Sequence, residues 1–277
     1  MRVEKLADRI RVYEPTDFNV VQTLDCGQIF RFKINGREAD VYSVDKHAHM
    51  ITYDDHIDIL TKDLNYFYDF FDFDRDYSII KSKLKNDKFL HPAVEYGYGI
   101  RILNNDAFEM IVSFIISANN NISRIKNSVE YLCLHFGKNM GEYYAFPTLN
   151  SLKAATVDDY RKAGLGYRAE QMFDTIQRLT EEDVKNITNM NESDMLNHLV
   201  KYKGIGEKVA NCIMLFGMRV KSVFPVDTWI NKVYNQLTKT NSTNRKMITR
   251  ELTNRYKELS GYAQQYFYYY YRDNKIS

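Results

Sequence analysis

Lys208 and Asp227 are the residues of this sequence whose types and spacing point most directly to chemistry. Lys208 follows the glycine-containing run 204–207 and stands where a helix is expected to begin, a place where the helix dipole disfavours an ammonium group. Surroundings that favour the neutral amine make a lysine nucleophilic, and a carboxylate such as Asp227 stabilises positive charge in a transition state. The alternatives are a lysine that merely extends into solvent and an aspartate that only caps the following helix.

The turn Gly204-Ile205-Gly206 is a second candidate site, for binding phosphate. Glycines let a backbone approach a ligand closely, and the first N–H groups of the following helix have no partner within that helix. These groups and the helix dipole suit a DNA phosphate without regard to base sequence. An ordinary turn between two packed helices has the same pattern, so the turn alone leaves both interpretations open.

The pattern of residues predicts a small sheet followed by helices, and these elements must position the candidate groups. From Leu64 onward the apolar period becomes helical, and residues 108–115 are apolar nearly all round, which is typical of a buried central helix. Strands, with Asn35-Gly36 as a two-residue hairpin turn, are expected over 9–13, 29–34, 39–44 and 50–53. Other helices are expected over 125–136, 158–163, 170–179, 194–202, 209–216, 229–237 and 266–271.

Composition places the chain among ordinary globular proteins. It has 277 residues, of which 44% are hydrophobic and 27% charged, and it contains no apolar run of the roughly 18 to 20 residues that a membrane helix needs. The N-terminus has no signal-peptide pattern, so we expect a cytoplasmic protein, nucleoid-associated if its source is prokaryotic. We separately expect a monomer. A net charge of +2 does not by itself indicate a nucleic-acid partner.

The cysteines and histidines do not predict a metal site. Cys26, Cys133 and Cys212 are far apart and odd in number, so they form neither a CxxC pair nor a disulfide framework. His47 and His49 share one face of a predicted strand, but no cysteine or carboxylate is spaced to complete a metal site with them. We therefore expect no bound metal and ordinary surface histidines.

The run 204–212, with Pro225-Val226-Asp227 after it, closely resembles the helix-hairpin-helix (HhH-GPD) superfamily of DNA glycosylases. This resemblance implies that Lys208 is a nucleophile, because lysine at this position marks the branches that are also lyases, and that Asp227 is its electrostatic partner. The three scattered cysteines exclude the branches with a C-terminal four-cysteine iron–sulfur cluster. The resemblance implies an α+β fold with two domains.

Within that superfamily, the sequence resembles the 8-oxoguanine DNA glycosylases. The segments that carry this resemblance occur in the family's order over nearly the whole chain: a pocket strand at 24–31, an asparagine-rich loop at 117–125, a wedge loop at 164–169 and a last pocket segment at 261–264. The fold predicted is a small N-terminal antiparallel sheet domain with trailing helices over 1–96. A mainly helical domain over 97–277 then contains the helix-hairpin-helix, at about 194–217, and the loop of the aspartate.

The family resemblance also implies which residues handle the opposite strand. A base must leave the duplex to be excised, and something must then fill the gap. Tyr167 is implied to wedge beside the orphaned partner and Asn119 to occupy the void. Arg124 and Arg168 are implied to donate to O2 and N3 of an orphan cytosine. Without the resemblance, both arginines would be interpreted as phosphate contacts or solvated surface.

Four residues are implied to line the lesion pocket. The Gly27 carbonyl would accept from N7–H of 8-oxoguanine, where guanine has only a lone pair, and Gln264 would bind the Watson–Crick edge. Cys212 and Tyr268 would enclose the purine ring. The alternatives are a bulge at Gly27, a core position for Cys212 and helix packing for Tyr268, which replaces the phenylalanine of the best-known relatives.

We therefore predict a bifunctional DNA glycosylase and AP lyase that excises 8-oxoguanine from duplex DNA, preferably opposite cytosine. Its reaction needs no cofactor, and a monovalent cation at the hairpin carbonyls is compatible with the superfamily. Trp229 stands where the best-known relatives have a histidine near a phosphate, and we assign it no role. The rival predictions are a glycosylase for an alkylated purine, normally without a lyase lysine, and a non-catalytic module that binds phosphate through the hairpin.

Overall fold

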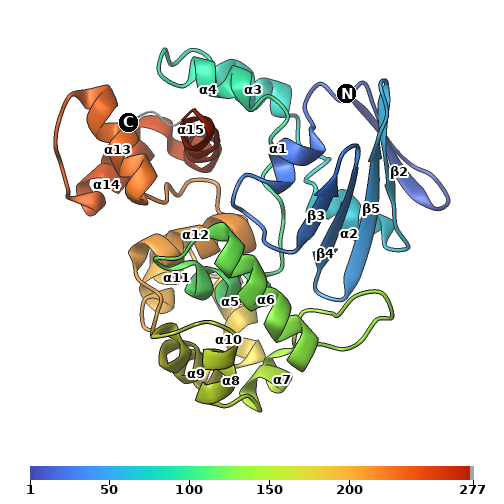
Figure 1. The fold of residues 1–277 in the computed structure, drawn as a ribbon. Coiled ribbons are helices and arrows are strands. Elements are labelled where there is room, and N and C mark those ends of the chain that lie inside the picture. Colours follow the sequence, from blue (N-terminus) through green and yellow to red (C-terminus); the bar gives the residue numbers. More distant parts are fainter. Residues whose placement is uncertain (275–277) are drawn as a thin grey trace. The chain divides into compact units, whose positions relative to one another are not determined.

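A six-stranded antiparallel sheet is the principal β-structure of the protein, whose computed structural model describes residues 1–274 (Figure 1). Its strand order is β1-β2-β6-β5-β4-β3. The pairs Ile10↔Ile59 and Val12↔Ile57 put buried aliphatic side chains opposite one another, which fixes the register of β2 and β6. The strands are β1 (Arg2–Lys5), β2 (Arg9–Tyr13), β3 (Phe32–Asn35), β4 (Glu38–Ser43), β5 (Lys46–Thr52) and β6 (His56–Leu60).

The sheet differs from the sequence prediction in four strands. Strands β1 and β6 were not predicted, and β5 begins at Lys46, well before the expected residue 50. The strand expected over 29–34 begins only at Phe32, and a short helix, α1 (Val20–Leu24), precedes it. Shortly before β3, the backbone takes a positive φ of 79° at Gly27, which is incompatible with extended structure at that residue. The predicted hairpin turn at Asn35-Gly36 is confirmed between β3 and β4.

All the other regular elements are helical, so the α+β class is confirmed. The helices that frame the first half of the chain are α2 (Leu64–Phe70), α3 (Tyr77–Leu84), α4 (His91–Tyr96), α5 (Ala107–Ser117), α6 (Ile122–Phe136) and α7 (Leu149–Lys153). Those that follow are α8 (Val157–Lys162), α9 (Arg168–Arg178), α10 (Glu181–Thr188), α11 (Glu192–Leu199), α12 (Glu207–Gly217), α13 (Thr228–Thr238), α14 (Arg245–Tyr256), the 3-10 helix η1 (Lys257–Leu259) and α15 (Ser260–Asp273).

The chain forms two compact units, each assembled from separate stretches of sequence. The first unit comprises Met1–Gln28, Met50–Asn104 and the described part of Arg219–Ser277, and the second comprises Ile29–His49 and Asn105–Met218. The division into 1–96 and 97–277 follows sequence order and stays a prediction. Lys208 belongs to the second unit and Asp227 to the first.

Helix α5 is the buried centre of the second unit. Its residues from Glu109 to Ile116 are all buried, and it packs against α6, α9 and α12 (Figure 1). The prediction of a central apolar helix is therefore confirmed. Helix α5 ends at Ser117 and is followed directly by the asparagine-rich loop, so a buried helix supports that loop.

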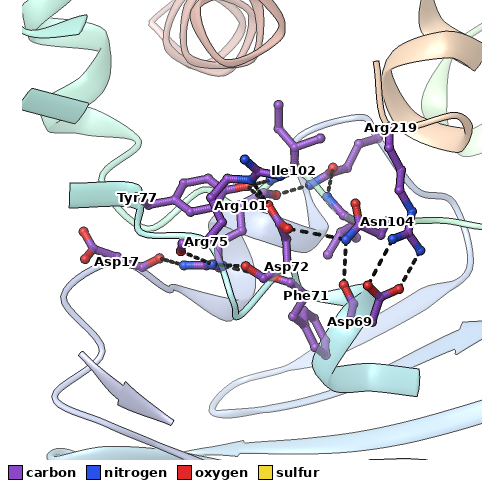
Figure 2. A network of polar contacts seen from close by, with 12 residues as sticks. Asp17, Asp69, Phe71, Asp72, Arg75, Tyr77, Arg101, Ile102, Asn104 and Arg219 are labelled. Carbon is purple, nitrogen blue, oxygen red and sulfur yellow. Dashed lines mark hydrogen bonds and ion pairs between the residues drawn. The ribbon is translucent and has the colours of Figure 1, made fainter. Parts of the chain in front are cut away.

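The first unit is held together by α15, which packs against α4, α13 and α14, and by a buried arginine. Arg101 is fully buried, donates to the carbonyls of Phe71 (2.8 Å), Asp72 and Arg75 (3.0 Å), and lies 4.0 Å from the Tyr77 ring centroid (Figure 2). Burying a guanidinium is tolerated because its N–H groups meet acceptors. The segment around residue 101 is consequently a fixed part of the core.

No helix within residues 1–274 combines the length and apolar character needed to cross a membrane.

Candidate active site

Lys208 lies in the first turn of α12, as predicted. Its side chain is half-buried, with Nζ 5.9 Å from the ring centroid of Phe114, and the N-cap residue Gly206 provides no side-chain cap. A Cβ built on Gly206 would have no neighbour within 4 Å, so the start of the helix is open to a ligand. Ile205 by contrast is buried, which anchors the turn in the core. These features favour the phosphate-binding interpretation of the turn.

The turn itself needs glycine at residue 204. Gly204 has φ of +83°, and a Cβ there would lie 3.1–3.3 Å from atoms of Gln171 and Ile115. Helices α11 and α12 pack on each other on either side of the turn. Cys212 stands four residues after Lys208 on α12, on the same helix face, and is buried. The second unit thus presents the amine and the thiol from a single rigid helix.

Asp227 is the N-cap of α13. Its carboxylate accepts a hydrogen bond from the Ile230 backbone N–H at 2.8 Å, so the capping interpretation is confirmed. The positive end of the helix favours negative charge at this position, and the bond to Ile230 uses only Oδ1 of the carboxylate. The neighbouring Trp229 is 38% exposed, and Lys232 Nζ lies 5.3 Å from its ring centroid.

Gly27 lies in an irregular segment, and the pocket strand expected over 24–31 is wrong. The chain leaves α1 at Leu24 and has no strand until Phe32. We call residues 23–28 the recognition segment. A Cβ built on Gly27 would lie 3.0 Å from Cε1 of Tyr268, so the ring would have to shift to admit a side chain there. The structure therefore brings together Gly27 and Tyr268, two of the residues predicted to line a pocket.

Gln28, to which the sequence assigned no role, fixes one end of the recognition segment. Its side chain is fully buried, and Nε2 donates to the carbonyls of Thr23 and Arg101, both at 2.8 Å. Its Oε1 accepts from the Leu103 N–H at 2.8 Å. A glutamine beside the apolar residues 29 and 30 was the available signal, because a buried amide must be hydrogen-bonded.

Helix α15 provides further contacts to the recognition segment. Gln265 Nε2 donates to the carbonyl of Cys26 at 2.6 Å, another contact that the sequence did not predict. Gln264, which was predicted to bind a ligand, is 6% exposed, and its Oε1 has no hydrogen-bond partner within residues 1–274. A buried amide oxygen without a donor is costly, so Gln264 is suited to accept a hydrogen bond from a bound molecule.

Asn119 and Tyr167 lie on two loops of the second unit that we call the insertion loops, residues 118–121 and 163–167, and Arg168 begins α9 directly after the second loop. Arg168 is 7% exposed, and its guanidinium donates to the carbonyls of Ala118 (2.6 Å), Asn119 (2.6 Å) and Leu165 (3.2 Å). Asn119 is exposed with φ of +49°, and Tyr167 is 57% exposed. Arg168 therefore ties the two loops together, while their predicted inserting side chains remain accessible.

Arg124 differs from Arg168 in its surroundings. It lies in the first turn of α6 and is exposed, and within residues 1–274 its guanidinium has no hydrogen bond or ion pair. Its backbone N–H donates to the Asn121 side chain, which caps the helix. The whole fork of Arg124 is thus available to a ligand, whereas Arg168 has already committed three of its five N–H groups.

The residues considered for metal binding have other partners. His47 and His49 both contact Asp40 Oδ1, at 2.7 and 3.0 Å, and within residues 1–274 no group of three or more histidine, cysteine, aspartate or glutamate residues is arranged to hold a metal ion. Cys26, Cys133 and Cys212 are buried and form no disulfide within residues 1–274. Burial raises the pKa of the Cys26 thiol to about 12, so this sulfur stays protonated.

Two family models match the chain. Residues 10–111 match the N-terminal domain of 8-oxoguanine DNA glycosylase, and residues 112–258 match the HhH-GPD superfamily of base excision DNA repair proteins. The Clostridium acetobutylicum 8-oxoguanine glycosylase/lyase, solved in complex with double-stranded DNA containing cytosine opposite to 8-oxoG, is similar to the whole chain. Its TM-score is 0.94 at 34% identity, over 100% of this chain and 99% of that chain.

Two curated relatives are also similar to this chain, each over a shorter stretch. The N-glycosylase/DNA lyase of Saccharomyces cerevisiae is 35% identical over 153 residues, which are 49% of this chain and 41% of that protein. The probable N-glycosylase/DNA lyase of Methanothermobacter thermautotrophicus is 29% identical over 235 residues, 76% of this chain and 74% of that protein. The aligned part of this chain thus covers about two fifths of the yeast relative and three quarters of the archaeal one.

Proposed function

The chain belongs to the 8-oxoguanine DNA glycosylase family of the HhH-GPD superfamily, and we propose from this premise that it excises 8-oxoguanine from duplex DNA and then cleaves the strand. The observation that carries the proposal is Lys208, a half-buried amine at an uncapped helix start. A phosphate bound by the turn of Gly204, Ile205 and Gly206 would place the DNA backbone beside this amine.

The Lys208 amine acts as the nucleophile. Its lone pair attacks C1′ of the damaged nucleotide, the glycosidic bond breaks, and the electron pair leaves with the purine, which takes up a proton. Loss of the amine protons and opening of the sugar ring give an imine between Lys208 and C1′. Abstraction of a proton from C2′ then expels the 3′ phosphate by β-elimination, and water releases the lysine. The steps are balanced without an external oxidant, reductant or cofactor.

The Asp227 carboxylate stabilises the positive charge that develops on the sugar as the base departs. Its N-cap bond at 2.8 Å fixes the carboxylate, so no reorganisation is needed during the reaction. Coordination of a monovalent cation by the hairpin carbonyls stays a prediction and has no part in these steps.

The lesion is recognised by Gly27, Gln264, Cys212 and Tyr268. A carbonyl acceptor at Gly27 attracts the N7–H of 8-oxoguanine and repels the N7 lone pair of guanine. The orphaned Gln264 Oε1 accepts from the Watson–Crick edge, where guanine and its oxidised form carry donors. We propose that Tyr268 and Cys212 contact the purine ring, whose faces stack readily on such side chains.

The opposite base is contacted by the insertion loops and Arg124. Tyr167 and Asn119, both exposed, enter the duplex where the damaged base has left. Arg124 and Arg168 donate to O2 and N3 of cytosine, and this pairing supports a preference for 8-oxoguanine opposite cytosine. Two of the five N–H groups of Arg168 are left for this contact after its three bonds to carbonyls.

Borohydride trapping tests this proposal. The wild-type protein should form a covalent adduct with a duplex containing 8-oxoguanine opposite cytosine, because borohydride reduces the imine to a stable amine. Lys208→Gln should abolish both the adduct and base release while retaining lesion binding. Asp227→Asn should slow single-turnover excision by about 100-fold or more at an unchanged melting temperature, since asparagine caps as well as aspartate but carries no charge.

The same experiment separates the rivals. A glycosylase without lyase activity would release the base with no adduct, and a phosphate-binding module would do neither. An adduct at near wild-type yield in Lys208→Gln would show that another amine is the nucleophile. A full-rate Asp227→Asn variant would reduce this residue to its capping role.

A further inference from the structure

We propose, on the basis of the proposed function, that Gln265 and Gln28 are positioning residues that set the orientation of the Gly27 carbonyl and thereby the discrimination of 8-oxoguanine from guanine. Neither side chain is expected to touch the lesion. Both act through the recognition segment, residues 23–28, which lies with its partners entirely in the first unit.

The Gly27 carbonyl needs such support because of the residue that carries it. Glycine is required by φ of +79° and by the close approach of Tyr268, but it is also the residue with the greatest backbone freedom. Within residues 1–274 the Gly27 carbonyl accepts no hydrogen bond. It is therefore free to accept from a ligand, and nothing bonded to its own oxygen keeps it aimed.

Helix α15 fixes the peptide plane on the N-terminal side. Gln265 Nε2 donates to the Cys26 carbonyl at 2.6 Å, and Arg272 Nη1, two turns later on α15, donates to the Asp25 carbonyl at 2.5 Å. Gln265 is 2% exposed, so water does not compete for its amide. The peptide between Cys26 and Gly27 is consequently held to a rigid helix.

The side chain of Gln28 fixes the residue on the C-terminal side. It joins the Thr23 and Arg101 carbonyls and the Leu103 N–H through three hydrogen bonds of 2.8 Å. Arg101 is itself bound to several carbonyls of the unit (Figure 2). The peptide plane that bears the Gly27 carbonyl thus lies between two anchored residues, which removes the rotation that glycine would otherwise allow.

The orientation of the Gly27 carbonyl is expected to affect the discrimination of 8-oxoguanine from guanine. A hydrogen bond from N7–H depends on the direction of the acceptor, and so does the repulsion between that acceptor and the N7 lone pair of guanine. An abasic site has no base, so strand cleavage there does not depend on the Gly27 carbonyl. A residue needed only for folding would affect both substrates equally.

The test compares Gln265→Met with a control. Methionine keeps the length and apolar stem of glutamine but cannot donate to Cys26. In Gln177→Met, the control, an amide is lost that donates to the Lys153 carbonyl at 2.8 Å in the second unit. Single-turnover rates are measured with full-length protein on duplexes containing 8-oxoguanine and on duplexes containing an abasic site. Binding of 8-oxoguanine and guanine duplexes is compared in the Lys208→Gln background.

Gln265→Met should slow 8-oxoguanine excision by about tenfold or more, as expected for a misdirected contact, and leave abasic-site cleavage within about threefold. Its preference for binding 8-oxoguanine over guanine should shrink by a similar factor. Gln177→Met should change neither the ratio of the 8-oxoguanine rate to the abasic-site rate nor this binding preference. Equal losses on both substrates, or no loss on either, would overturn the inference. A wild-type protein that excises no 8-oxoguanine would instead overturn the proposed function.

If Gln265→Met does not fold, Gln265→Glu provides the second measurement. It keeps the shape but places a carboxylate against the Cys26 carbonyl, and at neutral pH it should show the same selective loss on 8-oxoguanine. Partial recovery of the 8-oxoguanine rate as the pH is lowered toward protonation of Glu at position 265 would support a donor role, because the acid form again donates. If the ratio of the 8-oxoguanine rate to the abasic-site rate of Gln265→Glu does not change with pH, a donor role is contradicted.

Discussion

The recognition segment and the insertion loops are both irregular, but their side chains are used in opposite ways. In the recognition segment, buried amides from Gln28 and Gln265 hold the backbone, and the predicted contact is a backbone carbonyl. In the insertion loops the predicted contacts are exposed side chains such as Tyr167, and Arg168 is the buried residue that ties the loops together. Selecting one base over another requires a fixed acceptor, whereas entering a duplex requires accessible side chains.

The comparison predicts that damage to the recognition segment affects selectivity and that damage to the insertion loops affects entry into the duplex. The contrast should appear in which substrate is affected as well as in the size of the effect. Two predictions test this contrast, beginning with the most disruptive change, and a third concerns the stability of the helix that leads into one insertion loop.

Gly27→Ala should have the largest effect. The new Cβ would lie 3.0 Å from Tyr268 Cε1, and alanine is strained at φ of +79°. A backbone cost of about 1–3 kcal/mol corresponds to a loss of about 5- to 150-fold in excision of 8-oxoguanine. Cleavage of abasic sites should stay near the wild-type rate. Single-turnover assays on the two substrates measure the difference, and a parallel loss on both would show that the segment is only structural.

Arg168→Ala and Arg124→Ala should differ in their effect on stability but share an effect on the preference for the opposite base. Removing Arg168 deprives three carbonyls of a donor, so the free energy of unfolding should fall by about 1–3 kcal/mol. Arg124 is exposed, so its removal should change the free energy of unfolding by less than about 0.5 kcal/mol. Both variants should narrow the ratio of excision opposite cytosine to excision opposite adenine, about tenfold or more in the wild type.

Denaturant unfolding and excision opposite each of the four bases provide the measurements. If Arg124→Ala leaves the ratio between cytosine and adenine unchanged, Arg124 binds phosphate or solvent. If Arg168→Ala leaves the free energy of unfolding unchanged, the hydrogen bonds of Arg168 do not stabilise the insertion loops.

The smallest effect concerns Glu109, on the helix that leads into the asparagine-rich loop. Burial raises the pKa of its carboxyl to about 6, although Arg31 lies 3.7 Å away and the Val44 N–H donates to it at 2.8 Å. The folded state therefore keeps this proton to a higher pH than the unfolded state does. The stabilisation from protonation is complete below about pH 4.5 and is lost as the pH rises through about 6, at most about 2 kcal/mol.

Glu109→Gln removes this titration and still offers an oxygen to Val44. The melting temperature of the wild type, measured against this variant, should fall by a few degrees between pH 4.5 and pH 7. A difference between the two proteins that does not vary with pH would show that Arg31 compensates fully for the burial of Glu109.

Sequence patterns predicted the helices of this protein better than its irregular segments. The all-round apolar pattern of α5 and the glycine turn before α12 specify local structure directly, so both were predicted. The recognition segment was predicted as a strand because its conformation depends on Gln265, 239 positions away. The burial of Arg168 was missed for the same reason, since its acceptors at 118 and 119 lie on another loop. Such distant partners leave no periodic signal.

The bond between Gln265 and Cys26 also bears on how the protein is made. The two residues are 239 positions apart, so during synthesis Cys26 is exposed long before its donor has been translated. The first unit is assembled from three stretches of the chain and cannot be completed until α15 is available. Non-local contacts of this kind slow folding and leave early intermediates open to aggregation. The recognition segment is thus synthesised well before α15 and takes its final form only once α15 is available.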